Sequence, residues 1–279
     1  MNRFPILFRL LLVFGLLLGP RLAVAQQLPV NVSVSGEVAT VQIGPATAPL
    51  ADLTITFDDA TGLTPASLGV RADAVSVFDP GLNARLPSSS LTTIQSGFPV
   101  LITVEPPGNG GLSFLRQAHL DLHVHGLSYT AGSRLRLFKA PLNGTFVDVT
   151  YDVLPGSVRT RGTTGGWSQM LVILDQRSTT GIVTDKIAAL HVMLQALPAS
   201  ERNPLQLLLN GIQSAVNAGR YNLAISKVDA FRQRVSNRAG TYIPDEWRAT
   251  RDLTNSAGDL LSGADTLRFS IGFLRDFGP

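Results

Sequence analysis

Three of the four histidines of this chain lie on one short segment, residues 119–125. Its sequence, His119-Leu-Asp121-Leu-His123-Val-His125, alternates polar with apolar residues, which predicts a β-strand with all four polar side chains on one face. Residues i and i+2 of a strand lie about 6.5–7 Å apart, and His and Asp are ordinary zinc and copper ligands. The spacing therefore predicts a metal site at these four residues, with zinc or copper as its ion. A solvated sheet face without any cofactor is the alternative, and the one we favour.

Other motifs point away from catalysis. Gly166-Trp-Ser168-Gln-Met170 lacks the second glycine of a G-x-S-x-G motif, and it leads into a strand where a nucleophile elbow leads into a helix. The sequence offers no phosphate-binding loop and no convergent acid–base pair. We therefore predict that the protein is not an enzyme. Two candidate strands carry basic residues that we interpret as a solvated face paired with acids: Arg134, Arg136, Lys139, Arg159 and Arg161.

The histidine segment belongs to a series of short strands. Before residue 180, apolar residues recur at every second position and are separated by Gly, Pro, Asn and Asp, which is typical of antiparallel sheets. About ten strands with no helical period between them predict an immunoglobulin-like antiparallel β-sandwich over residues 26–178. The clearest candidate strands are 30–34, 38–43, 53–57, 98–105, 120–125, 135–138, 146–151 and 170–174.

After residue 180 the apolar period becomes helical. Pro198, Gly219 and Gly240 end three amphipathic stretches in turn, and Pro244 begins a fourth whose buried side includes Trp247. Four short helices with tight connections predict a small helical bundle over residues 179–263. The fold class is thus α+β, with a sandwich domain followed by a bundle domain. In the tail, residues 264–279, apolar residues fit a strand period and a helix period alike.

The first 25 residues predict export. They hold arginines but no acids, then an apolar run of about nine residues, and end in Ala23-Val24-Ala25 before Gln26. A basic start, a short apolar core and an A-x-A site are typical of a secretory signal peptide, and the run is far shorter than the roughly 20 residues of a membrane span. We therefore expect cleavage before Gln26, localisation in the periplasm or outside the cell, and no transmembrane segment in the mature chain.

Charge and cysteine content exclude several classes of protein. The chain has 23 Lys and Arg against 20 Asp and Glu, and three of the arginines lie in the leader, so the mature chain is close to neutral. A neutral chain argues against a nucleic-acid partner. Cysteine is absent, which excludes disulfides, thiol catalysis and cysteine zinc sites.

Roughly residues 205–262 contain the Gly219 turn, an Ala-and-Phe stripe with Ala224 and Phe231 at its centre, and Gly240. Through these features the helical region resembles a FIMAT-type module found at the C-terminal ends of secreted bacterial proteins. The sandwich region resembles uncharacterised secreted bacterial proteins through residues 134–138 and 165–177. Both resemblances imply an extracytoplasmic accessory role, and neither transfers a functional residue.

We predict an exported, non-enzymatic binding or structural protein of the bacterial periplasm or cell surface, with a protein or polysaccharide partner. Two alternatives stay open. One is a metal-binding protein or metal-dependent enzyme built on the histidine strand. The other is a carbohydrate-binding module using exposed aromatic residues such as Tyr129, Phe138 and Trp167.

Overall fold

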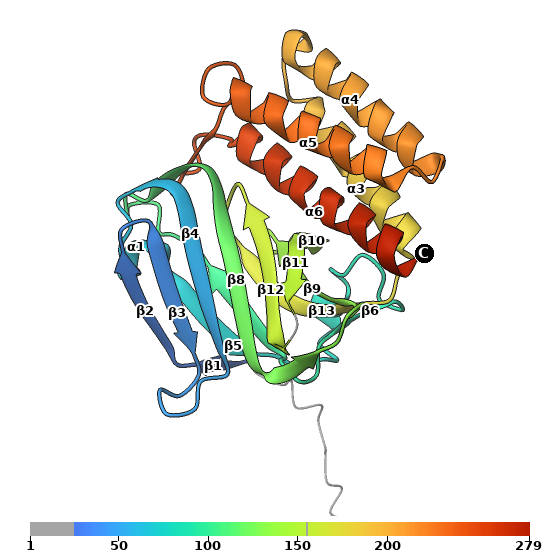
Figure 1. Ribbon diagram of the computed structural model, residues 1–279. Helices are drawn as coiled ribbons and strands as arrows, with labels where there is room; N and C mark the ends of the chain where they lie inside the picture. The colour runs from blue at the N-terminus through green and yellow to red at the C-terminus, as the bar shows by residue number, and fades with distance from the viewer. Residues whose placement is uncertain (1–24, 155) are drawn as a thin grey trace, which may run out of the picture.

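The computed structural model describes residues 25–154 and 156–279. The expected signal peptide, residues 1–25, lies outside the described residues except for Ala25. In the described part, two antiparallel sheets stack face to face, and a layer of helices lies across one of them (Figure 1).

The first sheet has seven strands in the order β1-β5-β7-β13-β9-β10, with β6 also paired to β13. All of its pairings are antiparallel. Its strands are β1 (Gln26–Leu28), β5 (Val70–Ala74), β6 (Thr92–Ile94), β7 (Val100–Val104), β9 (Leu135–Ala140), β10 (Val147–Asp148) and β13 (Gln169–Asp175). The short helices α1 (Pro65–Leu68) and α2 (Pro80–Asn83) flank β5 in the chain.

The second sheet also has seven strands, in the order β11-β12-β8-β4-β3-β2, with β14 paired to β8. Its long central strand β8 pairs with β4, β12 and β14. The strands are β2 (Val30–Ser35), β3 (Val38–Ile43), β4 (Ala51–Thr61), β8 (Ser113–Tyr129), β11 (Thr150–Leu154), β12 (Gly156–Thr164) and β14 (Glu246–Arg248).

The core lies between the sheets because alternate residues of each strand point inward. Leu53 and Ile55 of β4 pair with Leu122 and Leu120 of β8, and all four side chains are buried. Their chain neighbours point to the other face, which is where the polar residues of β4 and β8 gather. The expected antiparallel sandwich is therefore confirmed.

Four longer helices follow the sandwich: α3 (Thr179–Leu194), α4 (Ala199–Asn217), α5 (Tyr221–Arg238) and α6 (Ser256–Phe277). They share a second buried cluster centred on residues such as Leu190, Leu209 and Phe231. Helix α6 lies directly over the sandwich, with α3 and α5 beside it and α4 farther out (Figure 1). It contacts β8, β11 and β12.

The predicted fold class, α+β with an immunoglobulin-like sandwich domain followed by a small helical bundle, is wrong. Immunoglobulin-like sandwiches have about seven to nine strands in total, whereas each of the two sheets described here has seven. The helices also do not stand apart from the sandwich, because α6 covers part of the second sheet and β14, which lies between α5 and α6 in the chain, belongs to that sheet.

The fourth predicted helix differs most from the structure. Trp247, expected on a helix, lies in β14, where it packs into the sandwich core and its ring stacks on Phe114 at 5.3 Å between centroids. The last helix begins only at Ser256 and continues to Phe277. Residues 264–277, for which the sequence left strand and helix open, thus belong to α6.

A close contact fixes the start of α6 on β8. Asn255 caps the helix through a hydrogen bond from the Gly258 amide, and its own amide group donates to the carbonyl oxygens of Arg116 and Gly165. Gly258 leaves room for this approach, because a Cβ at that position would lie 2.0 Å from the Arg116 carbonyl oxygen. The first turn of α6 is therefore joined to β8 and to the turn that follows β12.

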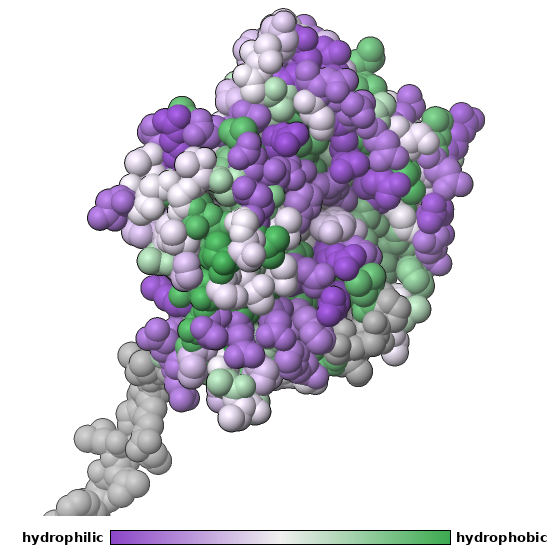
Figure 2. Space-filling view, turned by 60° about the vertical axis from the view of Figure 1, so that its left-hand side comes forward, coloured by the Kyte–Doolittle hydropathy of each residue, from purple (hydrophilic) through white to green (hydrophobic). Residues whose placement is uncertain are grey.

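Hydrophilic residues cover most of the face drawn in Figure 2, where hydrophobic residues form small separate patches. Among the described residues, no helix has both the length and the apolar composition needed to cross a bilayer. On this face the molecule offers no extended apolar surface to a ligand.

Candidate functional site

Two of the four predicted metal ligands meet a third residue from the neighbouring strand. His123 and His125 lie side by side on β8, with 4.8 Å between ring centroids. Asp52 of β4 is the direct cross-strand neighbour of His123, and its carboxylate lies 2.7 Å from Nε2 of His125. One potential ligand atom from each of the three residues lies within 4.8 Å of the others.

The other two predicted ligands have different partners. His119 lies 3.1 Å from the carboxylate of Asp58. Asp121 accepts a hydrogen bond of 3.0 Å from Arg161, and Arg159 lies 3.8 Å from the same carboxylate oxygen. Of the four predicted ligands, only His123 and His125 therefore belong to this cluster of three potential ligands. Whether any of the four binds metal stays a prediction.

A polar depression of about 350 Å³ lies on the same outer face of the second sheet, and His119 and His123 are among its lining residues. Burial and the nearby charge of Arg159 lower the pKa of His123 below its usual value, and His125 adds to the effect. The lining is made of side chains from β4, β8, β11 and β12: Asp52, Thr54, Thr56, His119, Leu120, Asp121, His123, Tyr151, Arg159 and Arg161.

The sequence contains a signal for Asp52, which is missing from the predicted set of four ligands. The expected strand begins at residue 53, whereas β4 starts at Ala51. Since Leu53 and Ile55 point inward, alternation already places Asp52 on the outer face. Alternation cannot supply the register between β4 and β8. Only that register shows that Asp52 lies beside His123.

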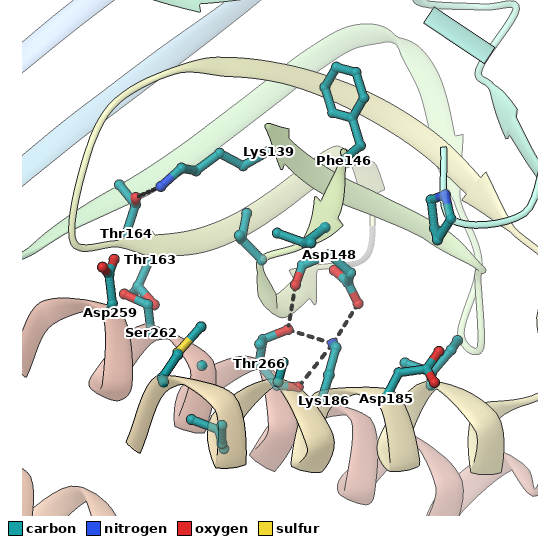
Figure 3. A pocket seen from close by; sticks show the side chains of 18 of the residues that line it. Lys139, Phe146, Asp148, Thr163, Thr164, Asp185, Lys186, Asp259, Ser262 and Thr266 are labelled. Carbon is teal, nitrogen blue, oxygen red and sulfur yellow. Dashed lines mark hydrogen bonds and ion pairs between the residues drawn. The ribbon is translucent and has the colours of Figure 1, made fainter. Parts of the chain in front are cut away.

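A second candidate site is the cavity of about 270 Å³ between the sandwich and the helices, here called the interlayer pocket. Figure 3 shows it from close by, with side chains from the sandwich on one side and from α3 and α6 on the other. Much of its wall is apolar, with Phe146, Ile182, Leu190 and Met193 among the lining residues. Its polar groups gather in two clusters.

The first polar cluster is centred on Lys139 of β9. Its ammonium group donates to Thr164 Oγ1 at 2.5 Å and to the Gly166 carbonyl oxygen at 2.8 Å, and Asp259 of α6 lies nearby in the same pocket (Figure 3). Burial lowers the pKa of Lys139, and the charge of Asp259 offsets only part of this. Burial also raises the pKa of Asp259. Burial thus shifts the pKa of each group in the direction that disfavours its charged form.

The second polar cluster joins α3 to the sandwich and to α6. Lys186 of α3 lies 2.6 Å from the Asp148 carboxylate of β10, and it also donates to Thr266 and Ser270 of α6. Both charged side chains are largely buried. Burial by itself would raise the pKa of Asp148, but the charges of Lys186 and Arg136 outweigh it and hold that pKa below the usual value.

The interlayer pocket was not foreseeable from local sequence patterns. Lys139, expected on a solvated basic face, is half-buried and lines this pocket, and no motif gives a role to Lys186 or Asp259. Alternation in residues 135–140 fails at Phe138, which is fully buried, and this is the one local sign that the strand is covered on both faces. The pairing with α6 depends on contacts between residues more than 100 positions apart, which no local pattern reveals.

Two of the aromatic residues proposed for carbohydrate binding are inside the protein. Phe138 is fully buried, and Trp167 is only 4% exposed and packs edge-on against Phe57. Neither ring is available to stack on a sugar. Tyr129 belongs to β8, and its side chain lies outside the described part of the structure.

Comparison with known proteins places the chain in a family but gives it no activity. A search of curated proteins and a search of solved structures each returned no match. Residues 13–275, nearly the whole chain, match a family of unknown function, DUF6689, and the chain belongs to that family.

Proposed function

We propose that the protein is an exported, non-enzymatic binding protein of the bacterial periplasm or cell surface and that its ligand occupies the interlayer pocket. The observation that carries this proposal is the composition of the pocket: a largely apolar cavity with two compact polar clusters, lined by both the sandwich and the helices. Ligand sites are typically concave, mostly apolar, and supplied with a few convergent polar groups at the boundary between structural units.

The lining indicates a small amphiphile as the ligand. Phe146, Ile182 and Met193 would contact its apolar body, while Lys139 and Asp259 would bind a polar head group. An ammonium group has three donors, and Thr164 and Gly166 accept two of those of Lys139 among the described residues. The remaining donor suits a hydroxyl or carboxylate oxygen of the ligand.

The proposal that the protein is exported rests on the signal-peptide pattern of residues 1–25. The resemblance of the helical region to a FIMAT-type module supports the same accessory role. On this proposal, the family is one of secreted bacterial proteins.

Calorimetric titration with octanoate and with octan-1-ol tests the pocket, because both probes have an apolar chain and an oxygen head group. We expect binding to the wild-type protein and to Ala188→Trp, and no binding to Ala189→Trp. Both alanines are exposed on α3, but only Ala189 lines the pocket, which a tryptophan there would fill. Equal binding by the two variants would show that the ligand site lies elsewhere.

A further inference from the structure

We infer that Asp52, His123 and His125 form a binding site for one divalent transition-metal ion, with Zn²⁺ as the ion that fits best. This site is separate from the interlayer pocket, because none of its three residues lines that pocket. It also differs from the predicted set of four, since His119 and Asp121 are not members and Asp52 comes from another strand.

The backbone holds the three ligands in place. His123 and Asp52 are opposite each other in the ladder between β8 and β4, and His125 follows two residues later on the same face of β8. The amide of His125 donates to the Leu50 carbonyl oxygen at 3.0 Å, so pairing with the chain next to β4 continues through this point. A regular pair of strands therefore positions all three side chains.

The side chains are already close to the arrangement that a metal needs. Zinc bound to imidazole nitrogen and carboxylate oxygen has bonds of about 2.0–2.2 Å, so ligand atoms around it lie about 3.2–3.5 Å apart. The three candidate ligand atoms lie within 4.8 Å of one another, and the Asp52–His125 pair is at 2.7 Å. Small rotations of exposed or half-buried side chains would bring them to the required spacing.

The donor set also selects the kind of ion. Imidazole nitrogen suits zinc, copper and nickel, whereas calcium and magnesium prefer sites made of oxygen ligands alone. Two nitrogen donors and one carboxylate therefore favour a transition metal. Three protein ligands leave a fourth position of a tetrahedral zinc ion open to water, and the polar depression beside Asp52 and His123 gives solvent access to it.

The test is calorimetric titration of the full chain with zinc chloride after removal of metal by dialysis against a chelator. We expect one zinc ion per chain and a higher melting temperature with zinc, because a ligand bound only by the folded protein stabilises it. His123→Ala and His125→Ala should each weaken zinc binding by at least about tenfold, through loss of one of three ligands. The same loss should follow Asp52→Asn, which keeps the shape but not the charge.

His119→Ala and Asp121→Asn are the matched controls, because both residues lie on the same face of β8 but are held by other partners. They should bind zinc as the wild type does. Melting curves without metal identify any variant that fails to fold. If Asp52→Asn binds zinc as tightly as the wild type, or if the controls lose as much affinity as His123→Ala, the three-residue site is wrong and the strand captures zinc only adventitiously. Absence of zinc binding by the wild type would also overturn it.

Discussion

Lys186 and Asp148 form a buried ion pair between the helical layer and the sandwich. Lys186 comes from the first long helix and Asp148 from an edge strand of the first sheet, and their charged atoms are 2.6 Å apart with 11% and 2% of the two side chains exposed. Because the lysine also donates to Thr266 and Ser270 of α6, one buried ammonium connects α3, α6 and the sandwich.

Removal of this lysine should destabilise the protein strongly. Lys186→Met leaves the Asp148 carboxylate buried without its main counter-charge, and breaking a buried pair in this way costs about 3–5 kcal/mol. The double variant Lys186→Met with Asp148→Leu removes both charges and should be more stable than the single variant. Urea unfolding measures both. A single variant within about 1 kcal/mol of the wild type would show that the pair contributes little to stability.

The carboxyl group of Asp259 should make stability depend on pH. Its pKa is raised in the folded protein above 3.8, its ordinary value. The folded state therefore holds this proton more tightly than the unfolded state, so the group stabilises the fold at low pH and that contribution is lost as the pH rises through the folded-state pKa.

Asp259→Asn removes this titration. We expect its stability relative to the wild type to increase as the pH is raised from about 4 and to level off above the folded-state pKa of the wild-type residue. Urea unfolding of both proteins between pH 4 and 8 gives the difference. A difference that stays constant over this range would contradict the raised pKa.

Two glycines of α6 provide a matched test of the contact between that helix and β8. A Cβ at Gly258 would lie 2.0 Å from the Arg116 carbonyl oxygen, whereas a Cβ at Gly272 would have no atom within 4 Å apart from the adjacent backbone of its own helix. Gly258→Ala should cost about 1–3 kcal/mol or more, because backbone atoms have to move. Gly272→Ala should gain about 0.5–1 kcal/mol, because alanine is the better helix former. Similar effects of the two changes on urea unfolding would show that the close contact is not rigid.

The mature chain should begin at Gln26. Cleavage there leaves β1 complete, since its first paired residue is Gln26 itself, opposite Ala74. Mass spectrometry of protein recovered from the periplasm or the medium of an expressing bacterium measures the N-terminus directly. Recovery of protein that still carries Met1 would contradict the signal peptide.

Individual strands are easier to predict from the sequence than the contacts between elements. Alternation at residues 53–57 and 120–125 identifies β4 and β8 and their inward faces, because side-chain direction in a strand is a local property. The same rule gives the common face of His123 and His125. It does not give register, so the predicted ligand set contains His119 and Asp121 in place of Asp52.

The contacts between the helical layer and the sandwich cannot be predicted from the sequence for a different reason. Strand β14 has three residues, too few for a period to be read, and its tryptophan fits a buried helix position as well as a buried strand position. Lys139 and Asp259 cannot be recognised from a local pattern either, because they line one pocket only through the packing of α6 on the sandwich. Local patterns describe elements, whereas these features arise from contacts over long separations in the chain.

The place of β14 between two helices determines when the molecule is able to finish folding. A chain emerges from the ribosome or a secretion channel with its N-terminus first. The edge of β8 beside Phe114 therefore stays unpaired until residues 246–248 have emerged. Until Trp247 arrives, that edge keeps open hydrogen-bonding groups and an uncovered aromatic ring, which are features that invite association with other chains. The native sheet is therefore completed only after almost the whole polypeptide has emerged.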